Sequence, residues 1–398
     1  MKYAILVPDG MADYPLDALG NKTPLEVANT PNMDSIVKQG VLGEVKTIPQ
    51  GMTPASDVAN MSIFGYDPKK YYAGRGPLEA ANLGIKLDKD EVAFRCNFVT
   101  TSETDMIDYS AGHISSKEAK VLIDFLNRKM PSEEYEFYAG VSYRHLFVVK
   151  DKGRDLDKIK CTPPHDILNQ KFKSHLPRGK NSDFLINLMN QSKDILLQHE
   201  INKVRLDLRE NPVNMIWLWG QGRDLSMPSY KERFKKTGAV ISAVDLIKGL
   251  GRILGLEVID VPGATGYYDT DYEAKAKYAI KALHNKDFVY VHVEAPDEAG
   301  HNGDMREKIT AIERFDNFVV GDLLKYLSKC GEDYRILVLP DHATPLSVRT
   351  HTSEPVCFCM SGKGVEHNGF ENLAENKAKE SKLKFSNGVE LIEYFFFA

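Results

Sequence analysis

Short, almost wholly apolar runs recur along the chain and predict buried strands. Examples are "YAILV" at 3–7, "DFVYVHV" at 287–293 and "RILVL" at 335–339. Between them lie longer segments with helical periodicity, such as "YEAKAKYAIKALH" and "IERFDNFVVGDLLKYLSK". Apolar strands that alternate with helices are typical of a parallel sheet covered by helices on both faces. We therefore expect an α/β core.

The pattern changes in the middle of the chain. Strand-like segments of mixed polarity, "EVAFRCNFVTT" and "EYEFYAGVSYRHLFVVK", lie on either side of a helical pattern, "SSKEAKVLIDFLNRKM". This predicts an α+β domain over residues 80–225, inserted into a core domain made of residues 1–79 and 226–398. A chain of 398 residues is too long for one ordinary hydrophobic core, which agrees with two domains.

The composition narrows the class of protein. With a formal net charge of −5 at pH 7, the chain lacks the basic excess of a general nucleic-acid-binding protein. No apolar run approaches the ~20 residues that cross a bilayer, and the N-terminus lacks a signal-peptide pattern. The five cysteines are odd in number and form no CxxC pair. We expect a cytoplasmic protein with no nucleic-acid or membrane partner; the sequence does not indicate its oligomeric state.

Three of the predicted strands end in proline followed by aspartate, two residues that a sheet interior cannot use. The aspartates are Asp9, Asp297 and Asp341. A single aspartate after a strand is usually a turn residue or a helix cap, but the threefold recurrence weakens that interpretation. Ligands of open α/β sheets bind beyond the carboxyl ends of the strands, so these carboxylates point to a binding site.

Histidines accompany two of the three aspartates. Asp297 and His301 are four residues apart, so one helical turn places both on one face. His342 follows Asp341 directly, and His351, which alone would be interpreted as a surface histidine, lies nearby in "RTHTSEPV". Mixed carboxylate and imidazole ligation suits Mn²⁺, Mg²⁺ or Zn²⁺. Two such ions about 4 Å apart are a recurrent device for phosphoryl transfer.

Ser56 is the candidate nucleophile. It lies at the predicted start of a helix, after a Gly/Pro-rich loop, in "GMTPASDVANMSIFGY". A serine in that place commonly caps the helix. However, a helix N-terminus also favours the anionic oxygens of a phosphorylated serine, and a nearby metal lowers the pKa of a hydroxyl. Ser56 and the predicted metal ligands therefore support one interpretation together.

The assembled residues resemble those of the cofactor-independent phosphoglycerate mutases, most closely their shorter archaeal-type branch, in the alkaline phosphatase superfamily. The resemblance runs nearly end to end, through "VPDGMAD", "TPASDVANMSIFGYDP", "GRGPLEAANLG", "HVEAPDEAGHNGD" and "LPDHATP". It implies an alkaline-phosphatase-like, mostly parallel sheet flanked by helices, with the inserted α+β domain binding substrate. It also implies interconversion of 3-phosphoglycerate and 2-phosphoglycerate without bisphosphoglycerate.

The resemblance further implies roles for the site residues. One divalent ion would be held by Asp297, His301 and His351, and the other by the set Asp9, Ser56, Asp341 and His342. Ser56 would take the phosphoryl group from the substrate and return it to the neighbouring hydroxyl. Cationic residues would bind the small phosphorylated substrate, and the candidates are Lys248, Arg223, Arg144, His165 and Arg95.

Other activities stay open at this stage. The chain departs from the archaeal pattern near "WLWGQGR" and "DYSAGHIS", where it carries two tryptophans and His113. Some relatives have been proposed as homoserine kinases, so alternatives are a phosphotransferase acting on another substrate and a phosphohydrolase of the same superfamily. The sequence contains no GxxxxGK[ST] loop, which weakens the case for a kinase that uses ATP. A binding module with structural metals is disfavoured, because the ligand set is open and rich in carboxylates.

Overall fold

The computed structural model describes residues 1–397, and the chain divides into two compact units. One is Met1–Tyr72 with Met227–Ala398, and the other is Ala73–Ser226. The first boundary lies earlier than the residue 80 expected from the sequence. The reason is helix α5 (Arg75–Asn82), which packs against two strands of the inserted unit, β3 (Glu91–Thr101) and β7 (Met215–Gly222), and so belongs to that unit.

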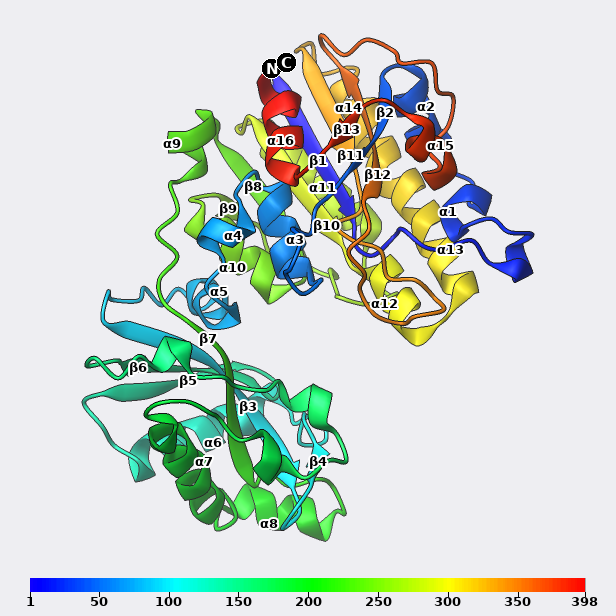
Figure 1. Cartoon of the computed structure of the whole chain (residues 1–398). Helices are drawn as coiled ribbons and strands as arrows, with labels where there is room; N and C mark the ends of the chain where they lie inside the picture. Colours follow the sequence, from blue (N-terminus) through cyan, green and yellow to red (C-terminus); the bar gives the residue numbers. More distant parts are fainter. Residues whose placement is uncertain (398) are drawn as a thin grey trace. The chain divides into compact units, whose positions relative to one another are not determined.

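The core unit is built on an eight-stranded sheet in the order β13-β2-β12-β11-β1-β10-β8-β9 (Figure 1). Central β1 pairs in parallel with β10 and with β11, and β12 runs antiparallel to both of its neighbours. The expected mostly parallel sheet is therefore confirmed. The strand bounds are β1 (Lys2–Pro8), β2 (Val41–Val45), β8 (Gly238–Ile241), β9 (Glu257–Val258), β10 (Phe288–Val293), β11 (Tyr334–Val338), β12 (Val356–Gly362) and β13 (Lys384–Phe385).

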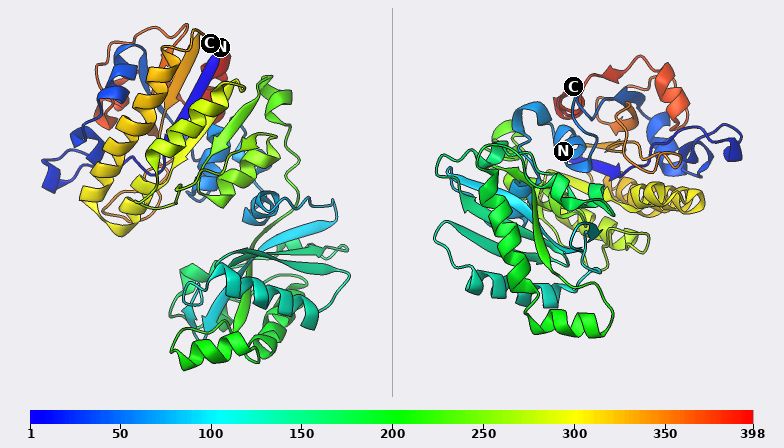
Figure 2. Two further views of the ribbon diagram at one scale, coloured as in Figure 1. Left: turned by 180° about the vertical axis from the view of Figure 1, so that it is seen from behind. Right: turned by 60° about the horizontal axis from the view of Figure 1, so that its bottom comes forward.

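Helices cover both faces of this sheet, because alternate residues of its strands are apolar on both sides. In β1, Ala4 and Leu6 belong to the main buried cluster, whereas Tyr3 packs edge-on against Phe395 and Phe396. The left view of Figure 2 shows the first face, covered by α2 (Pro31–Lys38), α11 (Tyr272–Leu283), α13 (Met305–Arg314), a π-helix (Phe315–Val320) and α14 (Gly321–Leu327). The second face carries α3 (Ser56–Ile63), α9 (Tyr230–Phe234), α10 (Asp245–Ile253) and α16 (Gly388–Phe397).

Shorter helices complete the core unit. Pro24 and Pro68 lie in the first turns of two of them, where the missing N–H costs no helical hydrogen bond. These helices are α1 (Pro24–Val27), α4 (Pro68–Tyr71), α12 (Ala295–Asn302) and α15 (Glu375–Glu380). Helix α12 directly follows β10, so it begins at the carboxyl edge of the sheet.

The inserted unit is a five-stranded sheet with helices packed on it. β3 pairs antiparallel with both β6 and β7, and its Phe94, Cys96 and Phe98 enter the buried core of the unit. The remaining strands are β4 (Met106–Asp108), β5 (Tyr135–Val141) and β6 (Arg144–Lys150). The remaining α-helices are α6 (Ser116–Lys129), α7 (Ser182–Leu196) and α8 (Glu200–Asp207).

Within residues 1–397, no helix is both long enough and apolar enough to cross a membrane. The cytoplasmic location expected from the sequence stays a prediction. Cys357 and Cys359 are buried in β12.

Glu375, at the start of α15, supplies a test of how the core unit responds to pH. Burial raises the pKa of its carboxyl to about 7, although a hydrogen bond from Thr23 Oγ1 (2.7 Å to Oε2) opposes the rise. The ordinary value is 4.5. Between these values the unfolded chain has lost the proton that the folded chain keeps, so stability falls as pH rises from about 4.5 to about 7 and then levels off.

We predict that Glu375→Gln, which cannot ionise, removes this fall. From pH 5 to pH 8 the variant should gain about 2 to 3 kcal/mol in unfolding free energy relative to the wild type. Urea unfolding at both pH values measures this difference. The exposed Glu380→Gln in the same helix is the matched control and should show no such gain. A Glu375→Gln difference independent of pH would contradict the prediction.

Candidate active site

Three buried carboxylates gather at the carboxyl edge of the core sheet. Asp9 follows β1, Asp341 follows β11, and Asp297 lies in the first turn of α12, after β10. Because β1 lies between β10 and β11 and is parallel to both, the three chain segments leave the sheet side by side. Gly10 permits this closeness: its φ is +61°, and a Cβ atom there would lie 2.5 Å from Asp297 Oδ1.

One group of ligand atoms consists of Asp297, His301 and His351. Asp297 Oδ2 lies 3.1 Å from His301 Nε2, and Asp297 Oδ1 lies 3.5 Å from His351 Nε2. The two Nε2 atoms are 3.0 Å apart. His301 Nδ1 donates to the carbonyl of Arg349 at 3.0 Å, which directs Nε2 inward. Three ligand atoms within 4.8 Å of one another can hold a metal ion.

A second group lies around Asp9. His342 Nε2 is 3.5 Å from Asp9 Oδ1, 3.5 Å from Asp341 Oδ2 and 3.1 Å from Ser56 Oγ. Asp9 takes part in two sets of atoms that can hold a metal, one with Asp297 and His342 and one with Asp341 and a further histidine, His292. The sequence-predicted ligands are therefore brought together around the shared carboxylate of Asp9.

Ser56 is the first residue of α3 and faces this second group. The N-cap residue is Ala55, and among residues 1–397 no side chain makes a capping hydrogen bond there, so the interpretation of Ser56 as the N-cap is wrong. Asn60 donates from Nδ2 to the Ser56 carbonyl and to Asp341 Oδ2, both at 2.8 Å, and Tyr290 donates its O–H to Asn60 Oδ1. These contacts hold the start of α3 against the carboxylate edge.

The electrostatics of the site favour a cation. Burial raises the pKa of Asp9 well above its ordinary value, and the charges of Asp341 and Asp297 raise it further. Burial has the same effect on Asp297, but hydrogen bonds from His301 and His351 outweigh it and lower its pKa. Within residues 1–397, the buried Asp9 Oδ1 has no hydrogen-bond partner. A buried carboxylate oxygen beside imidazole nitrogens fits a divalent metal.

Sequence reasoning missed His292, Glu294 and Lys275, which lie behind this edge and are buried. Burial lowers the pKa of His292, but its contacts with Asp341 and Glu294 outweigh this and raise it to about 9. The carboxylates of Asp341 and Glu294 thus stabilise the protonated form of the His292 ring. The available signal was a histidine inside the apolar run "FVYVHVE", which is more often a core residue than a ligand.

The inserted unit carries its own cluster of positive charge. Arg95 pairs in register with Trp219, and Arg144 with Asn97, so these side chains share one face of the sheet. The Arg95 guanidinium lies 4.7 Å from the Trp219 ring centre and 3.2 Å from Glu79 Oε1. Arg144 Nε is buried and, among residues 1–397, has no hydrogen-bond partner.

His165 borders the same cluster, whereas the other two cationic candidates pair with aspartates. The His165 ring lies 5.3 Å from that of Trp219. Arg223 binds Asp157 (2.6 Å) and Asp151 (2.8 Å), which tie it to the loop after β6. In the core unit, Lys248 lies 2.7 Å from the exposed Asp260.

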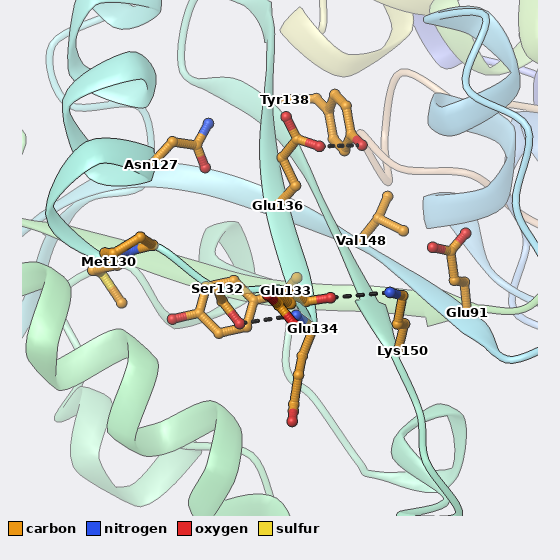
Figure 3. Close-up of a pocket in the computed structure, with 12 residues that line it drawn as sticks. Glu91, Asn127, Met130, Ser132, Glu133, Glu134, Glu136, Tyr138, Val148 and Lys150 are labelled. Atoms are coloured by element: carbon orange, nitrogen blue, oxygen red, sulfur yellow. Dashed lines mark hydrogen bonds between the residues drawn. The ribbon is translucent and has the colours of Figure 1, made fainter.

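A cavity of about 440 Å³ in the inserted unit contains none of the candidate site residues (Figure 3). Its walls carry the acidic side chains of Glu91, Glu133, Glu134 and Glu136, and Glu136 accepts a hydrogen bond from Tyr138. Such a lining repels an anionic substrate, so this cavity does not compete with the carboxylate edge as the candidate site.

Comparisons of sequence agree with one another. A family model described as 2,3-bisphosphoglycerate-independent phosphoglycerate mutase matches residues 37–202. Proteins of that name from Methanosarcina mazei and Methanosarcina acetivorans are 53% and 50% identical to this chain over 394 residues. Each match covers 98% of this chain and 98% of the relative.

Comparisons of structure show a likeness over 99% of the chain as well. A solved protein structure from Pyrococcus horikoshii has a TM-score of 0.84 and 30% identity, covering 99% of this chain and 96% of that chain. A cofactor-independent phosphoglycerate mutase from Thermoplasma acidophilum has a TM-score of 0.69 and 27% identity and covers 99% of both chains.

The carboxylate edge generates a prediction about metal removal. Because an ion that binds only the folded state stabilises it, adding Mn²⁺ to chelator-treated protein should raise the Tm, by an amount equivalent to about 2.7 kcal/mol at 100 times Kd. Asp297→Asn should abolish much of the rise, because Asp297 contacts both His301 and His351. Differential scanning calorimetry with and without Mn²⁺ measures both effects. The exposed Asp322→Asn should respond like the wild type, and an unchanged Tm in wild-type protein would contradict the prediction.

Proposed function

The chain belongs to the 2,3-bisphosphoglycerate-independent phosphoglycerate mutase family, and on that premise we propose that it interconverts 3-phosphoglycerate and 2-phosphoglycerate through a phosphoserine at Ser56. The observation that carries the proposal is the position of Ser56 Oγ, 3.1 Å from His342 Nε2 at the carboxylate edge. Relatives of that name match nearly end to end, which favours the mutase over the kinase and the phosphohydrolase considered from the sequence.

We propose that two divalent ions, Mn²⁺ or Mg²⁺ or Zn²⁺, complete the site. The first would be held by Asp297, His301 and His351; the ligands of the second would be Asp9, Ser56, Asp341 and His342. Bound there, such ions lower the pKa of a hydroxyl and neutralise charge on a transferred phosphoryl group. The grouping of Asp297, His301 and His351 supports the first set. The contacts of His342 with Asp9, Asp341 and Ser56 support the second.

The chain's own groups account for the two transfers. Ser56 Oγ attacks the phosphorus, the bond from phosphorus to O3 of the glycerate breaks, and O3 gains the proton that Oγ gives up. The 2-hydroxyl then attacks the phosphoserine, and its proton returns to Oγ. Because Ser56 is the first residue of α3, the backbone N–H groups of that helix end favour the phosphoserine oxygens. These two phosphoryl transfers consume no bisphosphoglycerate.

We also propose that Arg95, Arg144 and His165 bind an anionic group of the substrate. Arg95 and His165 both lie beside the Trp219 ring, and Arg144 shares a face of the sheet with Arg95 and has a buried Nε; these features support the role. A guanidinium matches a carboxylate or phosphate through paired N–H donors. For Arg223 and Lys248, which have aspartate partners, substrate binding stays a prediction.

Ser56→Ala tests the proposed function. The variant should keep its stability within about 1 kcal/mol, because Ser56 does not cap α3, yet lose mutase turnover by several orders of magnitude. Wild-type protein quenched during turnover should carry phosphate on the peptide that contains Ser56, as mass spectrometry can show.

Ser116 is the matched control, because it too is the first residue of a helix. Ser116→Ala should keep full turnover. Near-normal turnover in Ser56→Ala would overturn the covalent route. A wild-type protein that leaves 3-phosphoglycerate unchanged but phosphorylates homoserine with ATP would overturn the mutase assignment itself.

Arg144→Met tests the proposed anion-binding cluster. Loss of a charged hydrogen-bond donor should raise KM for 3-phosphoglycerate about 10- to 100-fold, with a smaller change in kcat. Arg154→Met is the control in the same unit, since Arg154 packs on Phe184 and pairs with Glu134. Steady-state kinetics of both variants measures KM and kcat. Equal KM values in the two variants would count against a role for Arg144 in binding.

A further inference from the structure

A network of buried polar side chains lies behind Asp9 and Asp341. The proposed mechanism does not use this network. Lys275 and His292 are 0% exposed and Glu294 is 3% exposed. Lys275 Nζ and Glu294 Oε2 form an ion pair of 2.7 Å in the interior of the core unit. Burying such a pair costs solvation free energy, so its presence behind the site calls for a physical reason.

Hydrogen bonds determine which atom of the His292 ring carries a proton. Glu294 Oε1 accepts from Ser242 Oγ at 3.0 Å and from the Ala243 N–H at 2.9 Å, and Oε2 accepts from Lys275. Glu294 therefore acts as a carboxylate acceptor on both oxygens. His292 Nδ1 lies 3.2 Å from Glu294 Oε1 and must donate to it. With the Nδ1–H held by Glu294, a metal ion can replace the proton at Nε2, and the ring would then present the Nε2 lone pair on its opposite side.

That lone pair faces the carboxylate edge. His292 Nε2 lies 3.3 Å from Asp9 Oδ2 and 3.8 Å from Asp341 Oδ2. Within residues 1–397, neither His292 Nε2 nor Asp9 Oδ1 has a partner with hydrogen-bond geometry. The strand register fixes this approach, because His292 pairs with Val7, two residues before Asp9. His292, Asp9 and Asp341 offer one nitrogen and two carboxylate oxygens that lie within 4.8 Å of one another, which is the arrangement of metal ligands.

We propose that His292 Nε2 is a direct ligand of the metal ion held by Asp9 and Asp341, and that Glu294 and Lys275 orient its ring. Ligating histidines typically donate their other ring N–H to a carboxylate, as His292 does to Glu294. This inference deepens the proposed function and rests on it, because it requires a cation at the carboxylate edge. The buried Lys275–Glu294 ion pair would then have a structural role, because it would hold the His292 ring in place as a ligand.

The additional imidazole has a consequence for the choice of metal. Mg²⁺ prefers oxygen ligands, whereas imidazole suits Zn²⁺, Mn²⁺ and other transition ions. With His292 and His342 both presenting Nε2 to the Asp9 group, this site should favour a transition ion over Mg²⁺. Replacing His292 by glutamine should shift the preference of the site towards Mg²⁺.

The first test is the binding of Mn²⁺ to metal-free protein, followed by the electron paramagnetic resonance signal of the free ion. Wild-type protein should bind two equivalents. In His292→Gln one class of sites should weaken about 10- to 100-fold while the other keeps its Kd. His367→Gln, at an exposed histidine of the same unit, is the control and should leave both classes unchanged. Unchanged affinities in His292→Gln, or equal weakening of both classes, would overturn the inference.

The second test uses wild-type protein and so does not depend on how the variant folds. In Co²⁺-loaded protein, a bound imidazole shows the N–H proton of its other nitrogen as a strongly shifted proton resonance. The His292 Nδ1–H is buried, so its resonance should persist longest after transfer to D₂O. No slowly exchanging shifted resonance in a protein that binds two Co²⁺ ions would contradict the inference alone, whereas a protein that binds no divalent ion would contradict the proposed function as well.

Discussion

Repulsion among three buried carboxylates is the constraint on which the rest of the site depends. Asp9, Asp297 and Asp341 meet because β1 lies between β10 and β11 and parallel to both. In an interior of low dielectric constant such a group is stable only with positive charge beside it. Imidazole nitrogens of His301, His351, His342 and His292 lie within 3.5 Å of the carboxylate oxygens of Asp297 and Asp9. The sheet thus places negative charge at one edge, where cations must neutralise it. The proposed chemistry uses these cations.

The nucleophile depends on the same edge. Asn60 donates to both the Ser56 carbonyl and Asp341, so hydrogen bonds tie the start of α3 to the carboxylates. The phosphoryl group would be transferred where cations and a helix N-terminus both favour anionic oxygens. Substrate anchoring, by contrast, is proposed for the inserted unit, whose Arg95 and Arg144 lie on one face of a separate sheet.

Local patterns predicted the parts of this protein that local physics determines. Apolar runs that end in Pro-Asp marked β1 and β11, and the spacing of Asp297 and His301 correctly placed both on one helix, α12. The grouping of ligands around each ion came from the resemblance, since sequence spacing alone does not show which side chains converge. The first domain boundary was missed because the position of α5 depends on its packing against β3 and β7. The ion-pair partners of Arg223, Asp151 and Asp157, were also not predicted, because they lie far from Arg223 in the sequence.

Anomalous X-ray diffraction from crystals of the Mn²⁺-loaded protein tests the two proposed metal sites most directly. Two anomalous peaks should appear at the carboxyl edge of the core sheet, one between Asp297, His301 and His351 and one between Asp9, Asp341 and His342. Metal analysis of the same crystals establishes the occupancy. Two equivalents of bound Mn²⁺ with no anomalous peak among these side chains would contradict the assignment of both metal sites.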